Sequence, residues 1–471
     1  MGIDPLSPLG TPLTICEWII RIGALFVVPL RRKPEATRSW LLLILFLPII
    51  GLLLYLAIGR PRFPAWRTAR FERLAPFRRA LALRLLSGRA LGGQQSKDIA
   101  ALVKNLGGWP TTRGNGIEFI DDYDGVISRL VDDIDQARQH VRLLVYIFAD
   151  DAVGRKVTEA LGRAVDRGIP CHVLVDPVGS HSWIRNTIRL LRDAGVETRK
   201  ALPFHLLGKR TRRDMRNHRK LFLIDGEIGY AGSQNIVAKD FRPGVTNREL
   251  TLRVTGPLVA EMTAVFLTDW YLETEVLLDQ EPVVPSKSGV AAAQLLPSGP
   301  DYPLEGFQTL LVWQVHEARV RIVLTTPYFV PDDGLLGAMR AAVLRGVEID
   351  LIVSAVADQP IVNLAQRSYY EELLGAGIRV HRFRKELLHA KNVSIDGTLA
   401  IVGSSNVDIR SFQLNDEVSV LLQDPISVAA LEEIQRRYIA NSDLLDLAQW
   451  RDRSWLGKLA ENLARLVSPL L

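Results

Sequence analysis

The stretch NHRKLFLIDGEIGYAGSQN, residues 217–235, has a close counterpart in LHAKNVSIDGTLAIVGSSN, residues 388–406. Both fit the pattern H-x-K-x4-D-G-x5-G-S-x-N, so the same polar and small residues recur at identical spacing. A lone H-x-K would carry almost no information. The whole pattern occurring twice indicates an internal duplication.

The segments around the two motifs repeat in the same order. VRLLVYIF at Val141 leads through a helical stretch to CHVLVD, and VRIVLTTPYFV at Val320 leads through a helical stretch to IDLIVS. This alternation predicts an α/β fold of two pseudo-symmetric repeats, each a mixed, largely parallel sheet flanked by helices. We expect the first repeat over residues 111–280, the second over 281–443, and the seam in the proline-rich stretch 282–300.

Each motif is expected to form a β-hairpin that presents polar groups to one place. Because residues two apart on a strand share a face, the histidine and the lysine of each motif project together. Asp-Gly is a favoured hairpin turn, so a structural role is one interpretation of the aspartates. The Gly-Ser pair ends the return strand and brings an asparagine back beside the histidine. The candidate catalytic residues are His218, Lys220, Asp225, His389, Lys391 and Asp396.

Two imidazoles, two ammonium groups and two carboxamides suit an anionic phosphodiester. The lysines, with Asn235 and Asn406, can hold the non-bridging oxygens, whose charge grows as phosphorus becomes five-coordinate. One histidine can attack phosphorus while the other protonates the departing alkoxide. A nucleophilic imidazole also needs an acceptor on its second nitrogen. Glu249 and Glu417 follow their histidines by 31 and 28 residues in comparable strands, so we expect them to orient these histidines.

The composition favours a partner that carries phosphate groups. The chain has 471 residues, 48% of them hydrophobic, a formal net charge of +6 and a pI near 9.3. Nucleic acid and anionic lipid both satisfy this charge balance. Two cysteines are too few for a disulfide framework or a cysteine-rich metal site.

No metal or nucleotide cofactor is expected. The histidines outside the motifs show no ligand spacing with carboxylates or cysteines, which favours surface or core positions. These are His140, His172, His181, His205, His316 and His381. Neither a P-loop nor a G-x-G-x-x-G fingerprint occurs. We expect the two lysines to supply the positive charge that a metal would otherwise provide.

The N-terminal part carries the clearest membrane signals. The uncharged run WLLLILFLPIIGLLLYLAI, residues 40–58, would extend about 28 Å as one helix, which predicts a retained membrane span. Residues 13–30 form a second apolar stretch, interrupted by Glu17 and Arg21, that either crosses the membrane or lies at its surface. Arginines alternate with apolar residues over 61–110, as in a basic amphipathic helix on an anionic membrane or in a solvated linker. Their excess places the C-terminal bulk in the cytoplasm.

Two further segments have open interpretations. The tail, residues 444–471, repeats Trp and Leu at helical spacing, as either a surface anchor or a helix packed on the body. The first repeat also carries an insertion before its motif. Much of it is LLGKRTRRDMRN, residues 206–217, whose cations are candidates for phosphate or lipid contact, with a solvated loop as the alternative.

The histidine, lysine and aspartate of each motif match the HKD motifs of the phospholipase D superfamily. Within it, the chain resembles bacterial cardiolipin synthases, from its N-terminal apolar segments through TPYFVPDDGLL at Thr326 and NVDIRSFQLNDE at Asn406 to the tail NLARLVSPLL. It departs from that family's usual pattern at Asn247-Arg248-Glu249 and at Asp416. The resemblance implies two phospholipase D-like repeats preceded by membrane helices, located at the bacterial cytoplasmic membrane.

The same resemblance implies transfer of a phosphatidyl group between two phosphatidylglycerol molecules, giving cardiolipin and glycerol. His218 would form a phosphatidyl-histidine, while His389 would protonate the leaving glycerol and then deprotonate the hydroxyl of the second lipid. The partners would be anionic phospholipid and membrane, not nucleic acid. A phospholipase D-type hydrolase, or a transphosphatidylase of another phospholipid, would use the same residues. Two further interpretations are an HKD nuclease and a non-catalytic lipid-binding scaffold.

Overall fold

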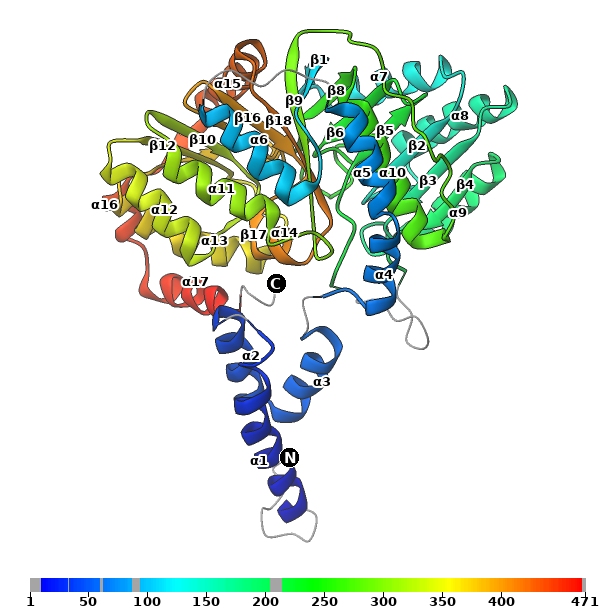
Figure 1. Ribbon diagram of the computed structural model, residues 1–471. Coiled ribbons are helices and arrows are strands. Elements are labelled where there is room, and N and C mark those ends of the chain that lie inside the picture. The colour runs from blue at the N-terminus through cyan, green and yellow to red at the C-terminus, as the bar shows by residue number, and fades with distance from the viewer. Residues whose placement is uncertain (1–9, 33, 60–61, 87–93, 204–213, 468–471) are drawn as a thin grey trace.

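Short runs of Val, Ile and Leu alternate with amphipathic helices twice along the chain, and the computed structural model shows them as two equivalent α/β halves (Figure 1). The structure describes all residues except 1–9, 33, 60–61, 87–93, 204–213 and 468–471. The helices that precede the halves are α1 (Gly10–Val27), α2 (Pro34–Phe46), α3 (Pro48–Ile58), α4 (Ala65–Arg73), α5 (Ala75–Leu85) and α6 (Gln94–Gly107).

The first half ends with a long helix that follows its motif hairpin. Its elements are β1 (Thr112–Ile120), α7 (Tyr123–Asp135), β2 (Val141–Val145), α8 (Ala152–Asp166), β3 (Cys171–Val175), α9 (Ile184–Asp193), β4 (Glu197–Lys200), β5 (Leu221–Ile224), β6 (Ile228–Gly232), β7 (Asn247–Arg248), β8 (Thr251–Thr255) and α10 (Leu258–Thr274). The hairpin β5–β6 carries the first motif.

The second half repeats this order, and its motif hairpin is β15–β16. Its elements are β9 (Ala291–Ser298), α11 (Gly306–Glu317), β10 (Arg321–Thr325), β11 (Phe329–Val330), α12 (Asp333–Leu344), β12 (Glu348–Ser354), α13 (Pro360–Gly375), β13 (Arg379–Phe383), β14 (Leu387–Leu388), β15 (Asn392–Ile395), β16 (Leu399–Gly403), β17 (Val407–Asp408), α14 (Ile409–Gln413), β18 (Glu417–Leu422) and α15 (Pro425–Ala440). The tail adds β19 (Ser442–Leu444), α16 (Leu447–Arg451) and α17 (Trp455–Val467).

One mixed sheet runs through both halves. In the described residues it has 15 strands, ordered β19-β13-β12-β10-β15-β16-β18-β9-β1-β8-β6-β5-β2-β3-β4. Only β2-β3-β4 and β10-β12-β13 pair in parallel within it, so the expectation of largely parallel sheets is wrong. Helical crossovers join the parallel strands, whereas the motif hairpins turn tightly and must return antiparallel.

The two halves meet along β9 and β1, at the centre of the sheet. β9 pairs with β18 on one side and with β1 on the other. The predicted seam is therefore not irregular throughout, because residues 291–298 form a fully buried strand. The sheet bends here, so that β16 and β18 contact β6 and β8 around one apolar core that α10 and α15 share. The halves cannot separate without exposing this core.

The arginine-rich helices α4 and α5 belong to the body and pack against α10. Arg67 is fully buried and its Nη1 donates to Glu273 at 2.6 Å, while Arg70 Nη1 donates to the carbonyl of Leu272 at 2.7 Å. The interpretation of this segment as a basic helix on a membrane surface is therefore wrong for these two arginines. Glu273 pairs with Arg67, and Glu275, directly after α10, pairs with Arg70, so these carboxylates neutralise the two arginines.

The predicted span over residues 40–58 is not one helix. α2 ends at Phe46 and α3 begins at Pro48, which has no N–H to continue the helical hydrogen bonds. The proline ring also disfavours a helical residue before it, and Leu47 has φ −130° and ψ 72°. α3 folds back on α2, with the rings of Trp40 and Tyr55 5.3 Å apart. No helix among the described residues is both long enough and apolar enough to cross a membrane.

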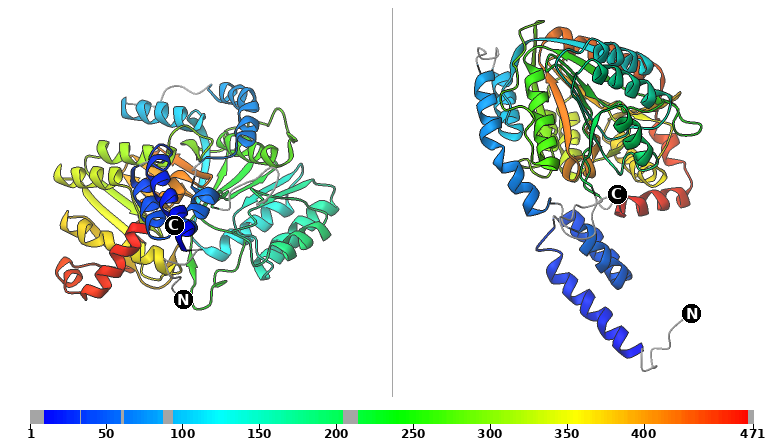
Figure 2. Two further views of the ribbon diagram at one scale, coloured as in Figure 1. Left: turned by 90° about the horizontal axis from the view of Figure 1, so that it is seen from below. Right: turned by 90° about the vertical axis from the view of Figure 1, so that its right-hand side faces the viewer.

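The N-terminal helices project from the body beside the C-terminal helix α17 (Figure 2). Glu17 and Arg21, four residues apart in α1, form an ion pair at 3.2 Å. Ser39 Oγ of α2 donates to the carbonyl of Leu466 in α17 at 2.9 Å. α17 packs on α13 with one face, as the interpretation of the tail as a helix packed on the body expects, and exposes Trp455 and several leucines on the other. The surface-anchor interpretation stays a prediction.

Candidate active site

Each motif histidine lies on a segment that pairs with the opposite half. The N–H of His218 donates to the carbonyl of Asp416 at 2.9 Å, and the N–H of Asp416 donates to the carbonyl of Arg216 at 2.9 Å. At the equivalent place, the N–H of His389 donates to the carbonyl of Arg248 at 2.8 Å, next to the parallel pair β14–β7. These short pairings bring the motif of one half against the post-hairpin strand of the other.

The glutamates hold the histidines across this boundary. Nδ1 of His218 lies 3.0 and 3.1 Å from the carboxylate oxygens of Glu417, and Nδ1 of His389 lies 2.8 and 2.9 Å from those of Glu249. Each glutamate thus contacts a histidine, but the pairing is exchanged relative to sequence order. An ionised carboxylate only accepts, so Nδ1 carries the proton and Nε2 keeps its lone pair.

Residues that the sequence analysis did not assign hold the glutamates in turn. Ser404 Oγ donates to Glu417, and Nδ2 of Asn415 donates to the same carboxylate at 3.4 Å. Nδ2 of Asn247 donates to Glu249, also at 3.4 Å. The sequence carried a signal for these amides, because N-x-E occurs in both halves, at residues 247–249 and 415–417.

The motif lysines lie behind the histidines. Lys220 and Lys391 are 1% and 2% exposed, and each donates through Nζ to the carbonyl of its own motif histidine, at 2.7 and 2.5 Å. The ring of Tyr146 covers one side of this group, with its centroid 4.8 Å from that of His218 and 5.3 Å from Nζ of Lys220. The ammonium groups are therefore shielded from water, which strengthens their attraction for an anion.

A pocket of about 500 Å³ opens over the histidines, with residues of both halves around it. His218, His389, Asn235 and Asn406 all line it. Oδ1 of Asn235 accepts the N–H of Ile147 at 3.0 Å, which leaves its Nδ2 group for a ligand. Oδ1 of Asn406 is buried and has no hydrogen-bond partner among the described residues. Two imidazoles and two amides thus meet in one concave site.

The motif aspartates lie at the hairpin turns and do not line this pocket. Asp225 and Asp396 have φ of 55° and 52°, and each is followed by a glycine that also has positive φ, as a tight hairpin turn requires. Asp225 accepts three backbone N–H groups, from residues 138–140, and Asp396 accepts three from residues 319–321, all at 2.7–2.9 Å. Their place in the candidate catalytic set is corrected to a structural one, because they tie each hairpin to the start of β2 or β10.

Burial dominates the electrostatics of the site. It lowers the pKa of His218 and of His389 to about 4, against the opposing effect of the glutamates. It also lowers the pKa of Lys220 to about 7 and that of Lys391 to about 8. Burial alone would raise the pKa of the glutamates, but the facing histidine and lysine hold it below its usual value. Both imidazoles are therefore neutral at pH 7.

The arginine-rich insertion contributes only one described cation near the site. Lys209, Arg210, Arg212 and Arg213 lie outside the described residues. Arg216 is buried, with its guanidinium 3.5 Å from Asp176 and donating to the carbonyl of Leu202 at 2.8 Å, so it serves the fold. In the part of the chain that the structure describes, no group of three or more His, Cys, Asp or Glu side chains is placed to hold a metal ion.

Comparison with known proteins identifies relatives along nearly the whole chain. A family model described as "Cardiolipin synthase, PLD-like domain" matches residues 130–270 and 311–439, and a phospholipase D-nuclease N-terminal model matches 19–60. Cardiolipin synthase A of Pectobacterium carotovorum is 33% identical over 98% of this chain and 100% of its own length. Cardiolipin synthase A of Proteus mirabilis is 34% identical over 96% of this chain and 97% of its own.

Solved structures share the fold at much lower sequence identity. Phosphatidylserine synthase of Haemophilus influenzae matches with a TM-score of 0.60 at 14% identity, covering 80% of this chain and 100% of its own. Polyphosphate kinase of Porphyromonas gingivalis matches with a TM-score of 0.50 at 18% identity, covering 71% of this chain and 49% of its own.

Replacing a turn aspartate tests its structural role. In Asp225→Asn an amide NH₂ would face a backbone N–H, so we expect a loss of about 1–3 kcal/mol of stability with the activity of the histidine pocket retained. Asp396→Asn is the matched variant in the other half. Thermal unfolding of both proteins, with turnover measured at a temperature where they are folded, checks this. An inactive variant of unchanged stability would contradict the assignment.

The buried lysines predict a pH-dependent cost to stability. Lys220 has a pKa of about 7 in the folded protein and of about 10.4 in an unfolded chain, so the unfolded state binds more protons between these values and stability rises with pH there. We expect Lys220→Met to be more stable than the parent by about 1–4 kcal/mol at neutral pH, with the gap narrowing towards about pH 10. Melting curves across this range measure the gap, and Lys200→Met, at an exposed lysine, is the control. A stability difference between Lys220→Met and the parent that stays constant or widens with pH would contradict this prediction.

Proposed function

The chain belongs to the cardiolipin synthase family of phospholipase D-like phosphatidyltransferases, and on this premise we propose that its pocket transfers a phosphatidyl group from one phosphatidylglycerol to another. The products are cardiolipin and glycerol. The observation that carries the proposal is the pair of imidazoles facing one pocket, each held at Nδ1 by a buried glutamate. Such a pair supplies a nucleophile and a proton donor to the same phosphorus.

The first step forms a phosphatidyl-enzyme. Nε2 of His218 attacks phosphorus, the bond from phosphorus to the head-group glycerol oxygen breaks, and His389 gives its Nε2 proton to that oxygen. His389 must first be protonated, although burial lowers its pKa to about 4. The anionic phosphodiester raises that pKa when it binds, because it adds a negative charge within hydrogen-bonding distance. Glycerol leaves as the neutral alcohol.

The second step reverses the roles of the groups. Nε2 of His389 takes a proton from a hydroxyl of the second phosphatidylglycerol, whose oxygen attacks phosphorus while the bond from phosphorus to His218 breaks. One phosphodiester replaces another, so the reaction needs no activated nucleotide. The two motifs are nearly symmetric, so the attack is assigned to His218 by analogy with the superfamily.

The lysines and asparagines support the five-coordinate phosphorus of both steps. Its equatorial oxygens carry more charge than those of the bound lipid, and Lys220 and Lys391 lie in a dry environment where their attraction is strong. Asn235 and Asn406 line the same pocket and can donate to these oxygens. Water that enters the pocket would instead release phosphatidic acid, which is the hydrolase alternative.

We further propose that the enzyme works on the cytoplasmic membrane of a bacterium, with its body on the cytoplasmic side. The support is a surface of exposed apolar side chains on α1–α3, which include Trp18, Phe26 and Phe46, continued by Trp455 on α17. These elements lie on the same side of the body (Figure 2). The excess of arginine after residue 58 favours the cytoplasmic side.

Product analysis tests the reaction. We expect the detergent-purified protein, mixed with phosphatidylglycerol vesicles and a chelator without nucleotide, to form cardiolipin and glycerol in equal amounts. His218→Ala should lose both products, by about 10²-fold or more, because the remaining histidine cannot both attack and protonate. Lipid chromatography with glycerol quantification measures them. Phosphatidic acid as the only lipid product would favour the hydrolase, and unchanged transfer by His218→Ala would refute the mechanism.

Each glutamate holds the histidine of the opposite half, so each should serve the steps in which that histidine acts. We expect Glu417→Gln to slow glycerol release in the first turnover by about 10²-fold, because the nucleophile His218 loses its tautomer and orientation. Glu249→Gln should slow both glycerol release and the attack by the acceptor, because it holds the acid and base His389. Rapid-quench measurements with head-group-labelled lipid separate the steps. If Glu249→Gln instead spared acceptor attack, the histidine roles would have to be exchanged.

A further inference from the structure

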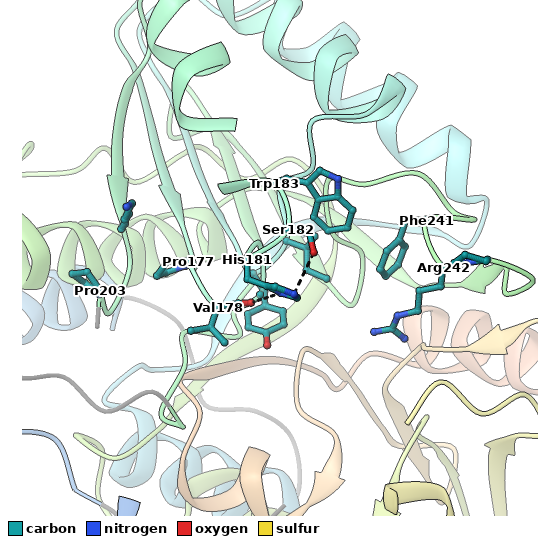
Figure 3. Close-up of a pocket in the computed structure, with 13 residues that line it drawn as sticks. Pro177, Val178, His181, Ser182, Trp183, Pro203, Phe241 and Arg242 are labelled. Carbon is teal, nitrogen blue, oxygen red and sulfur yellow. Dashed lines mark hydrogen bonds between the residues drawn. The ribbon is translucent and has the colours of Figure 1, made fainter. Parts of the chain in front are cut away.

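A second cavity, of about 900 Å³, adjoins the catalytic pocket, and the described residues that line it all belong to the first half (Figure 3). The cavity and the pocket adjoin, because both are lined by Tyr146, Ile147, Val178, Phe241 and Arg242. The proposed chemistry consumes only a phosphodiester and a hydroxyl and leaves this larger space without a role. A ligand in the catalytic pocket would extend into it.

The lining of the cavity is mostly apolar, and its polar side chains include Ser182, Lys200 and Arg242. Pro177, Val178, Trp183 and Phe241 form much of the wall, with the rings of Trp183 and Phe241 6.1 Å apart, edge to face. At the rim, exposed Ser182 lies within hydrogen-bonding distance of the His181 ring (Figure 3). A large apolar hollow with a few polar groups at its edge fits hydrocarbon rather than a sugar or a free head group.

The second half presents a different surface to the catalytic pocket. The Tyr328 hydroxyl donates to Asp358 at 2.7 Å, and Nε2 of Gln359 donates to the Tyr328 hydroxyl at 2.9 Å. Both Tyr328 and Gln359 line the pocket, so a hydrogen-bonding set faces the ligand there. Such a set suits the hydroxyls of glycerol. The cleft is therefore asymmetric although the motifs that build it are nearly symmetric.

Arg242 lies at the junction of the two spaces. It lines both of them and forms an ion pair with Asp358 of the second half. Its guanidinium is thus placed where the phosphate end of a bound lipid would continue into its glycerol backbone. Tyr146 lies on the same boundary, with its ring against His218. A group attached to His218 would have the apolar cavity directly beside it.

We infer that this cavity is the subsite for the diacylglycerol part of the donor phospholipid, an inference that rests on the proposed function. The glycerol backbone and the first carbons of the acyl chains lie between Trp183 and Phe241, and the phosphate lies at the histidines. The exchangeable glycerol then lies over the second half. This subsite holds the phosphatidyl group in place while glycerol leaves and the acceptor enters.

The dependence of the first step on chain length tests the subsite. With phosphatidylglycerols of about four to eight carbons per chain, at monomeric concentrations, kcat/KM for glycerol release should rise about fourfold per methylene that becomes buried. Ser182→Trp, which narrows the cavity at its rim, should reduce this to less than about twofold. Ser128→Trp, at an exposed position of α7 outside the cavity, should keep the parent dependence.

The outcomes separate the subsite from the reaction. If the parent protein releases glycerol but Ser182→Trp keeps the parent slope, the subsite is refuted and the proposed function stands. If the slope changes only when the acceptor chains are varied, the cavity serves the acceptor and the inference is wrong. If the parent releases no glycerol from any phosphatidylglycerol, the proposed function itself fails.

A binding measurement that needs no turnover gives a second test. His218→Ala protein, incubated with phosphatidylglycerol that carries a diazirine near the carboxyl end of an acyl chain, should be labelled by light on the peptides that contain Trp183 or Phe241. Excess unlabelled phosphatidylglycerol should remove the label. Labelling confined to the exposed helices α1–α3 would overturn the inference.

Discussion

Each imidazole of the pocket donates a hydrogen bond through its Nδ1–H to a buried carboxylate from the opposite half of the chain. This exchange makes the site a property of the joined halves, because neither half holds its own histidine in the required tautomer. The short parallel pairings at Asp416 and Arg248, and the core that α10 and α15 share, all serve to keep the exchange in register. A shift of one residue at either pairing would turn the glutamate away from its histidine.

The same arrangement places two lysines and two glutamates in a dry environment. Burying these charges costs stability, and the lowered pKa of Lys220 and of Lys391 expresses that cost. Hydrogen bonds from Ser404 and from the amides of Asn247 and Asn415 offset part of it on the glutamate side. On the lysine side each Nζ donates to an uncharged histidine carbonyl, so the protein keeps there a positive charge that the five-coordinate phosphorus can neutralise.

The two duplicated motifs provide equivalent catalytic groups, and the differences between the halves determine the orientation in which the lipid binds. The two motifs offer equivalent groups to the phosphorus, but the first half adds an apolar cavity and the second half adds Tyr328 and Gln359. A symmetric cleft would bind a lipid in two opposite orientations with equal affinity. Because the two halves present different surfaces to the pocket, one orientation of the lipid is favoured. That orientation decides which histidine attacks phosphorus and which one transfers the proton.

The sequence by itself determined the repeat, the two hairpins and the histidines, lysines and asparagines of the motifs, because these depend on spacing within one hairpin. It also singled out the two glutamates, because they occupy comparable strands after the two hairpins. It did not determine that Glu417 serves His218, that Asp225 ties a turn to β2, or that Arg67 is buried against Glu273. It also overstated the span at residues 40–58, where Pro48 was visible but its effect depended on whether α3 could pack back on α2. Each of these was decided by contacts between residues far apart in the chain, since the cost of burying a charge or breaking a helix depends on the partner that tertiary packing provides.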